Sequence, residues 1–123
     1  MKTFIKNLFP YKVWVRIIFL YQLINFYFFK KYKCRGSIDK QLMQLINKDK
    51  GIYLEVGAYN GLAESVSLRF QVEKNWNGIL IEPNTIHFEH LKFFRNKDVC
   101  VNNVCLAPKD INKKVYLKNL NQM

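Results

Sequence analysis

The sequence has few of the residues that build metal sites and disulfide frameworks, with three cysteines and two histidines in 123 residues. Cys34, Cys100 and Cys105 form no C-x-x-C pair and no cluster with a histidine, and their number is odd. A zinc site and a disulfide framework are therefore not expected, and we predict no metal. Cys100 and Cys105 lie in an apolar run, which favours buried thiols and a reducing, cytoplasmic location.

Acidic residues are also scarce: nine of them face 20 lysines and arginines, for a net charge of +11. Residues 1–38 contain eight bases and no acid, so the remaining residues carry 12 bases against nine acids, or +3. The body is thus close to neutral, and only four of the bases are arginines, which make most base-specific contacts. We predict no nucleic-acid partner.

The apolar content is high enough for a packed core, at 50% hydrophobic and 15% aromatic residues. A length of 123 residues favours one domain, and the sequence shows neither internal repeats nor a low-complexity linker. We divide it into a basic, hydrophobic helical segment at 1–36 and a folded body at 37–123.

Residues 13–29 form the longest apolar run, flanked by lysines on both sides. Arg16 leaves only residues 17–29 free of charge, which is short for a membrane span, and no signal-peptide cleavage site follows. On a helical wheel the polar residues fall within one half: Lys12, Arg16, Gln22, Asn25 and Lys30. Two interpretations remain open. The helix lies peripherally on a membrane, or its apolar side packs on the fold or on a second copy.

The body alternates helices and apolar strands. The pattern predicts a helix after Ser37 with four residues facing inward: Ile38, Leu42, Leu45 and Ile46. Buried strands are predicted at 52–56, 78–81 and 99–106. Helices are predicted between them, at 61–74 and at 85–95, the second capped by Asn84. This order indicates an α/β fold with a parallel sheet and right-handed crossovers.

In such sheets ligands bind beyond the carboxyl ends of the strands, and two groups of residues fall there. Gly57 and Gly61 follow the first strand, where Gly57 allows close approach of the backbone to a ligand and Gly61 allows close helix packing. Glu82 ends the next strand, where a carboxylate can accept hydrogen bonds from both hydroxyls of a ribose.

The loop lacks the third glycine of a pyrophosphate cradle, so a nicotinamide-dependent oxidoreductase is the less favoured enzyme class. Glu55 directs negative charge to the same region, which suits a cationic ligand. The sulfonium and amino groups of S-adenosylmethionine fit that charge.

Three motifs, at 53–61 (YLEVGAYNG), 75–84 (NWNGILIEPN) and 101–108 (VNNVCLAP), resemble the N-terminal half of FkbM-type methyltransferases. This class I family uses S-adenosylmethionine and mainly methylates hydroxyls. The resemblance covers about residues 51–108 and implies a Rossmann-like sheet and a small-molecule or glycan acceptor. It places six residues around the methionine part of the cofactor: Glu55, Gly57, Ala58, Tyr59, Asn60 and Gly61. It places Glu82 on the ribose with Pro83 beside it, and Asn103 near the adenine.

The chain departs from the family after the third strand. Residues 115–117 can make a short extra strand, but the family's acidic motif after a fourth strand is absent. In the family's strand order, residues 52–56 then become a hydrophobic edge strand. We therefore expect a truncated or split enzyme completed by a second chain, or one that covers this edge by self-association.

No catalytic residue can be assigned from the sequence. His87 and His90 are i, i+3 neighbours on the helix at 85–95, and we interpret them as solvated surface residues. The leading hypothesis is an S-adenosylmethionine-dependent methyltransferase or its cofactor-binding half. The alternative is a non-catalytic remnant or a membrane-associated interaction module.

Overall fold

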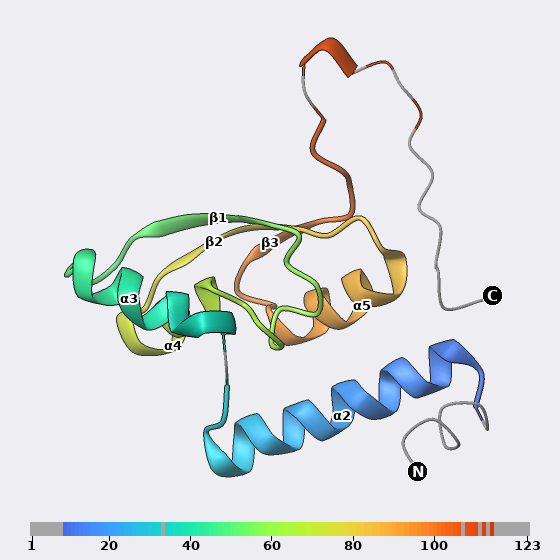
Figure 1. The fold of residues 1–123 in the computed structure, drawn as a ribbon, viewed down its shortest axis with the longest axis horizontal. Coiled ribbons are helices and arrows are strands. Elements are labelled where there is room, and N and C mark those ends of the chain that lie inside the picture. Colours follow the sequence, from blue (N-terminus) through green and yellow to red (C-terminus); the bar gives the residue numbers. More distant parts are fainter. Residues whose placement is uncertain (1–8, 33, 107, 111, 113, 115–123) are drawn as a thin grey trace.

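The computed structural model describes residues 9–32, 34–106, 108–110, 112 and 114 (Figure 1). The predicted extra strand at 115–117 lies outside them. The elements follow in the order α2 (Tyr11–Phe29), η1 (Arg35–Ser37), α3 (Ile38–Leu45), β1 (Ile52–Val56), α4 (Ser67–Lys74), β2 (Asn77–Ile81), α5 (Thr85–Phe94), β3 (Val99–Val101) and η2 (Pro108–Asp110).

The three strands form one parallel sheet in the order β1-β2-β3, which confirms the predicted α/β class. Leu54 pairs with Ile79, which pairs with Val99. Two residues further along the strands, Val56, Ile81 and Val101 are partners. The third strand ends at Val101, so its predicted extension to residue 106 is wrong. Within the described residues β1 has a neighbour on one side only, and it is the expected edge strand.

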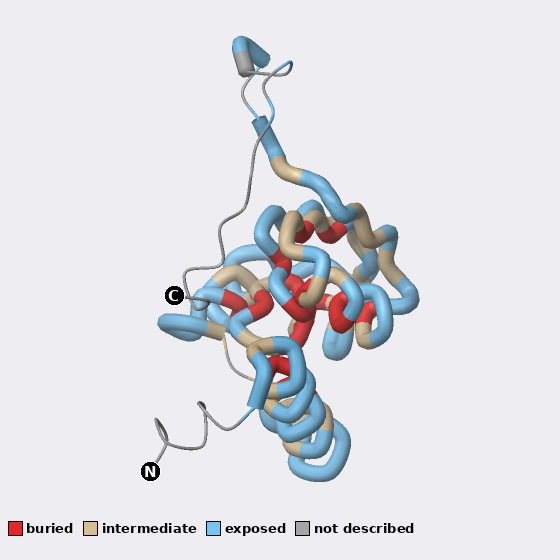
Figure 2. The backbone as a smooth tube through the Cα atoms, turned by 90° about the vertical axis from the view of Figure 1, so that its right-hand side faces the viewer, coloured by how far each residue is buried: buried red, intermediate tan, exposed pale blue. Residues whose placement is uncertain are grey.

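Helices α3, α4 and α5 cover one face of the sheet, and the core lies between these two layers (Figures 1 and 2). Ala58, Leu80 and Leu91 form its centre, and each is at most 2% exposed. Gly78 of β2 is required by this packing, because a Cβ atom there would lie 1.9 Å from the carbonyl oxygen of Tyr53. Trp76 covers Gly51 in the same way at the start of β1.

The opposite face of the sheet, here called the outer sheet face, is apolar and largely exposed. It consists of the residues that alternate with the core positions: Ile52, Leu54, Val56, Ile79, Ile81, Val99 and Val101. Ile52 is 80% exposed and Leu54 is 65% exposed. Residues 52–56 do form the predicted strand, but the prediction that it is buried is wrong for the side chains on this face, since no described helix covers them.

Helix α2 forms a third layer, packed on α5 on the side away from the sheet (Figure 1). The ring of Phe19 stacks on His90 at a centroid distance of 4.3 Å, and Phe26 meets Phe94 edge-on at 5.1 Å. One side of α2 therefore packs on the fold, but it is the side that carries Gln22. The interpretation that the apolar side of the helix packs on the fold is wrong, since Tyr21 and Phe28 on that side are 67% and 79% exposed. In the described part of the chain α2 is the one helix long and apolar enough to cross a membrane by length and composition.

Two helices differ from the sequence prediction. Helix α4 begins at Ser67 rather than at Gly61, and residues 61–66 form turns. Helix α3 begins after Ser37 as predicted, but it ends at Leu45, before the predicted inward residue Ile46, and Ser37 makes no side-chain capping bond. Its buried residue is Asp39, which pairs with Arg69 of α4 at 2.6 Å, whereas the predicted core residues Ile38, Leu45 and Ile46 are exposed.

The predicted burial of two thiols is only partly right. Cys100 is half-buried beside the core, and burial raises the pKa of its thiol. Cys105 is exposed, because the chain has left the sheet before it reaches that residue.

Candidate functional site

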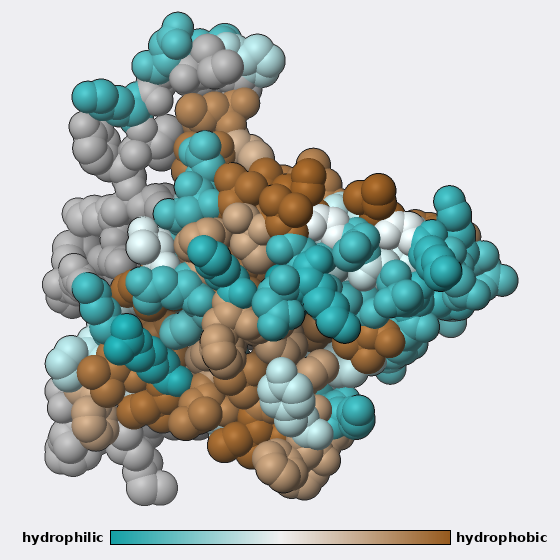
Figure 3. Space-filling model, turned by 180° about the vertical axis from the view of Figure 1, so that it is seen from behind, coloured by the Kyte–Doolittle hydropathy of each residue, from teal (hydrophilic) through white to brown (hydrophobic). Residues whose placement is uncertain are grey.

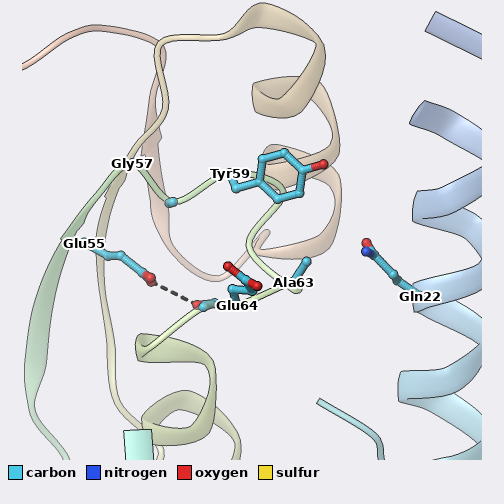
Figure 4. A pocket seen from close by; sticks show the side chains of 8 residues that line it. Gln22, Glu55, Gly57, Tyr59, Ala63 and Glu64 are labelled. Atoms are coloured by element: carbon cyan, nitrogen blue, oxygen red, sulfur yellow. Dashed lines mark hydrogen bonds between the residues drawn. The ribbon is translucent and has the colours of Figure 1, made fainter. Parts of the chain in front are cut away.

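A cavity of about 490 Å³ lies where β1 ends and the chain turns towards α4 (Figure 4). Its lining residues come from β1, from the loop after it and from α2: Gln22, Glu55, Gly57, Ala58, Tyr59, Ala63, Glu64 and Ser65. Its volume is in the range typical of small-molecule sites. The cavity is at the carboxyl end of the strands, where ligands bind in sheets of this kind.

Both loop glycines have positive φ angles, of +75° each. A Cβ atom on Gly57 would meet nothing within 4 Å, so this backbone is open towards the cavity side, as predicted. A Cβ atom on Gly61 would lie 2.5 Å from Arg95 and 2.6 Å from Leu91. Gly61 thus permits close packing, but against α5 rather than at the start of α4.

The Glu55 side chain reaches from β1 to the start of α4. Its carboxylate accepts hydrogen bonds from the backbone N–H groups of Val66 (3.0 Å) and Ser67 (3.4 Å) and from the hydroxyls of Ser65 and Ser67. These donors include unpaired N–H groups at a helix N-terminus, where a carboxylate is stabilising. Glu55 therefore holds the loop as well as lining the cavity.

The Glu82 carboxylate is 6% exposed and binds the two loops that follow β1 and β2. Its Oε2 atom accepts from the N–H of Tyr59 at 2.8 Å, and its Oε1 atom accepts from the N–H of Asn84 at 2.8 Å. It fixes Tyr59 at the rim of the cavity but does not line the cavity itself.

The remaining predicted residues lie at different distances from the cavity. Asn60 is buried and accepts from the N–H groups of Leu62 and Ala63, while its amide donates to Gln22 of α2 at 2.7 Å. Pro83 and the exposed Asn103 are outside the lining. The structure thus brings together Glu55, Gly57, Ala58 and Tyr59, with Asn60 and Gly61 shaping their loop.

The buried guanidinium of Arg95 holds the loop at 61–67 by hydrogen bonds, and this role was not predicted from the sequence. Arg95 is 1% exposed and donates to the carbonyl of Gly61 and to the hydroxyls of Ser65 and Ser67 at 2.9–3.2 Å. Its charge is paired with Asp98 at 2.9 Å. Arg95 comes at the end of α5, so no local pattern connects it with the loop at 61–67.

The lining includes two carboxylates, Glu55 and Glu64, and none of its residues is basic. This local excess of negative charge stands out in a chain of net charge +11. Tyr59 faces the same region, and burial raises the pKa of its hydroxyl. The cavity therefore favours a cationic or neutral ligand over a phosphate-bearing one.

Comparison with known proteins adds no relative. No protein-family model, curated protein or solved structure matches the chain. The candidate site is therefore argued from its own geometry.

The two histidines are buried, so their prediction as solvated surface residues is wrong. His87 and His90 are 9% and 8% exposed, because Tyr59 covers the first and Phe19 of α2 stacks on the second. The Nδ1 atom of each has no hydrogen-bond partner among the described residues. Burial lowers the pKa of both imidazoles.

Proposed function

We propose that the chain binds S-adenosylmethionine in the cavity at the carboxyl end of β1 and is the cofactor-binding half of a methyltransferase. The observation behind the proposal is the acidic lining of this cavity, formed by Glu55 and Glu64 without a basic residue. S-adenosylmethionine carries a sulfonium and an ammonium group, and both are attracted to carboxylates. The resemblance of residues 53–61 and 75–84 to FkbM-type enzymes supports the same ligand.

The residues on the cavity fit such a ligand in a specific way. Glu64 and Glu55 would face its cationic groups, and the open backbone at Gly57 would lie against its methionine part. Glu82 would act mainly through Tyr59, whose N–H it holds at 2.8 Å. The bound group supplies an activated methyl carbon for direct displacement, and the protein's contribution is to position donor and acceptor.

The proposed acceptor is a hydroxyl of a small molecule or glycan, as the resemblance implies. Three of the groups that could take up its proton are disfavoured. His87 and His90 are buried under aromatic rings, and Glu55 is engaged by α4. We therefore propose that a second polypeptide contributes the acceptor site.

Calorimetric titration of the purified chain tests the proposal. S-adenosylmethionine and S-adenosylhomocysteine are expected to bind with micromolar affinity, and NADH is expected not to bind. Glu64→Gln should weaken binding of S-adenosylmethionine by roughly three- to tenfold, because a charge attraction is lost. Glu89→Gln is the matched control, since Glu89 is exposed on α5 outside the cavity.

Glu82→Gln is expected to weaken binding as well, through a displaced Tyr59, and circular dichroism must show that this variant is folded. Absence of binding by the folded wild-type chain would contradict the proposal. Binding of NADH in preference to S-adenosylmethionine would contradict it too and would favour an oxidoreductase.

A further inference from the structure

The side of α2 that faces away from the fold is an unbroken apolar surface, here called the α2 outer stripe. It comprises seven residues that are 39–79% exposed: Val13, Ile17, Leu20, Tyr21, Ile24, Tyr27 and Phe28. In Figure 3 hydrophobic residues gather along the lower edge of the molecule, where α2 lies. None of the seven is charged, which is unusual for the solvent side of a helix in a protein dissolved in water.

The orientation of α2 is fixed by polar contacts on its inner side. Gln22 accepts a hydrogen bond from the buried Asn60 at 2.7 Å, and Phe19, 6% exposed, stacks on His90. Turning the outer stripe inward would break these contacts. The helix therefore presents its apolar side outward because the fold holds it that way.

Cations lie at both ends of the stripe. Lys12 and Arg16 are near its beginning, and Lys30 and Lys31 follow directly after its end, with all four exposed. Of these four cations, only Arg16 has an acidic partner among the described residues, Glu89 at 4.0 Å. The ammonium group of Lys31 lies 5.5 Å from the ring centre of Phe29. The stripe is thus flanked by positive charge that is not neutralised by the fold.

We propose that the α2 outer stripe binds the surface of an anionic lipid bilayer. Aliphatic side chains enter the boundary between headgroups and acyl chains, tyrosines suit the interface, and lysines attract anionic headgroups. The helix lies in the plane of the interface rather than across the bilayer, because its inner side is occupied by α5 and by Asn60. This inference does not rest on the cofactor proposal, since no residue of the stripe lines the cavity at Glu55; Tyr21 alone of the seven lines the neighbouring cavity that shares Glu64 with it.

Co-sedimentation of the full chain with vesicles tests the inference. Vesicles of phosphatidylcholine alone are compared with vesicles that also contain phosphatidylserine. We expect binding to the second kind that is at least about tenfold stronger and falls as salt is raised. Equal binding to both kinds, or none to either, would overturn the proposal.

Two pairs of variants assign the surface. Ile24→Ser/Phe28→Ser should reduce binding to the anionic vesicles about tenfold or more, whereas the control Leu45→Ser/Ile46→Ser removes exposed apolar residues at the end of α3 and should not. Lys30→Glu/Lys31→Glu should reduce binding similarly, whereas Lys40→Glu/Lys48→Glu changes the net charge equally and should reduce it much less. Equal losses in test and control variants would overturn the assignment.

The same experiments distinguish two alternative roles of the stripe, a membrane-spanning helix and a dimer interface. Protein that resists alkaline extraction from the vesicles and ignores the lysine variants would indicate a membrane-spanning helix. A dimer abolished by Ile24→Ser/Phe28→Ser, in a chain that does not bind vesicles, would indicate a second copy. Either result would refute the proposal.

Discussion

The Arg95 side chain is the residue on which the loop after β1 depends most. Its guanidinium is completely buried, and it connects Asp98 with Tyr53 and with the two serines that bind Glu55. Asp98 in turn accepts from the N–H of Gly78 at 2.8 Å, so the pair joins the loop to β2. Removing one member of a buried ion pair leaves the other charged and unpaired in the core.

Arg95→Met is therefore expected to lower the free energy of unfolding by about 3–5 kcal/mol. Urea denaturation measures the change, and Arg95→Met/Asp98→Asn should recover part of it because no lone charge remains. Arg16→Met is the control: its pair with Glu89 is exposed, and its loss should change stability by less than about 1 kcal/mol. A similar decrease in the free energy of unfolding for Arg16→Met and Arg95→Met would show that the buried ion pair contributes no more to stability than the exposed one.

The buried histidines predict a dependence of stability on pH. Burial is the main cause that lowers the pKa of both imidazoles from 6.5, and for His90 the neighbouring His87 and Arg16 act in the same direction while Glu89 opposes them. Below pH 6.5 the two histidines bind protons in the unfolded chain but stay largely neutral in the folded chain. Stability is therefore full above pH 6.5 and is lost as the pH falls towards the lower pKa values of the folded state.

Urea midpoints between about pH 5 and pH 7 measure this effect, because most exposed carboxylates stay ionised in that range. His87→Phe/His90→Phe cannot titrate but keeps an aromatic ring against Phe19 and Tyr59. We expect its midpoint to vary much less with pH in this window. An equally steep pH dependence in this double variant would assign the effect to other groups.

At the scale of elements, Glu55 gives α4 a cap that comes from a strand. Val66 occupies the N-cap position and has no side chain that can accept a hydrogen bond, so the Glu55 carboxylate accepts from Val66 and Ser67 instead. Glu55→Gln should lower the free energy of unfolding by about 1–2 kcal/mol, because a charge-assisted cap is lost. Glu64→Gln, a carboxylate on the same cavity, should cost less than about 0.5 kcal/mol by the same denaturation assay. Equal effects of the two substitutions would argue against capping by Glu55.

The same elements show which features can be predicted from sequence. Helix α5 was predicted nearly to its ends because its signal is local: the Asn84 side chain accepts from the N–H groups of Ile86 and His87. The strands at 52–56 and 78–81 follow from short apolar runs ended by Gly57 and Glu82.

The features that the sequence did not reveal depend on partners far along the chain. Asp39 is buried because Arg69 pairs with it, and His90 is buried because Phe19 covers it. The start of α4 was misplaced because its cap, Glu55, is 11 residues earlier on a strand. In the candidate site, the loop residues were predicted from their glycines, whereas Gln22 was missed because only tertiary packing brings α2 to the cavity.

At the scale of the whole molecule, the described part of the chain covers the sheet on one face only. Parallel strands are normally buried on both faces, and here the rows Leu54–Ile79–Val99 and Val56–Ile81–Val101 lie on the side opposite the helices. Strand β1 adds an edge without a partner in the described residues. Such an edge with an apolar face is a surface on which another polypeptide adds strands and layers.

We predict that in the purified chain this surface binds a second copy. The outer sheet face contains no charge, so it is compatible with an identical face across a two-fold axis, the commonest symmetry of soluble oligomers. Sedimentation velocity should show a concentration-dependent dimer, which high salt strengthens or leaves unchanged because the contact is apolar.

Leu54→Lys/Ile79→Lys should convert this dimer to monomer, since it places like charges in the centre of the contact. Ile24→Ser/Phe28→Ser on the α2 outer stripe should leave the dimer intact and thereby separates the two apolar surfaces. A wild-type chain that stays monomeric at all concentrations would contradict self-association. The β1 edge, which has no partner among the described residues, would then be left for a different chain, the one proposed above to contribute the acceptor site.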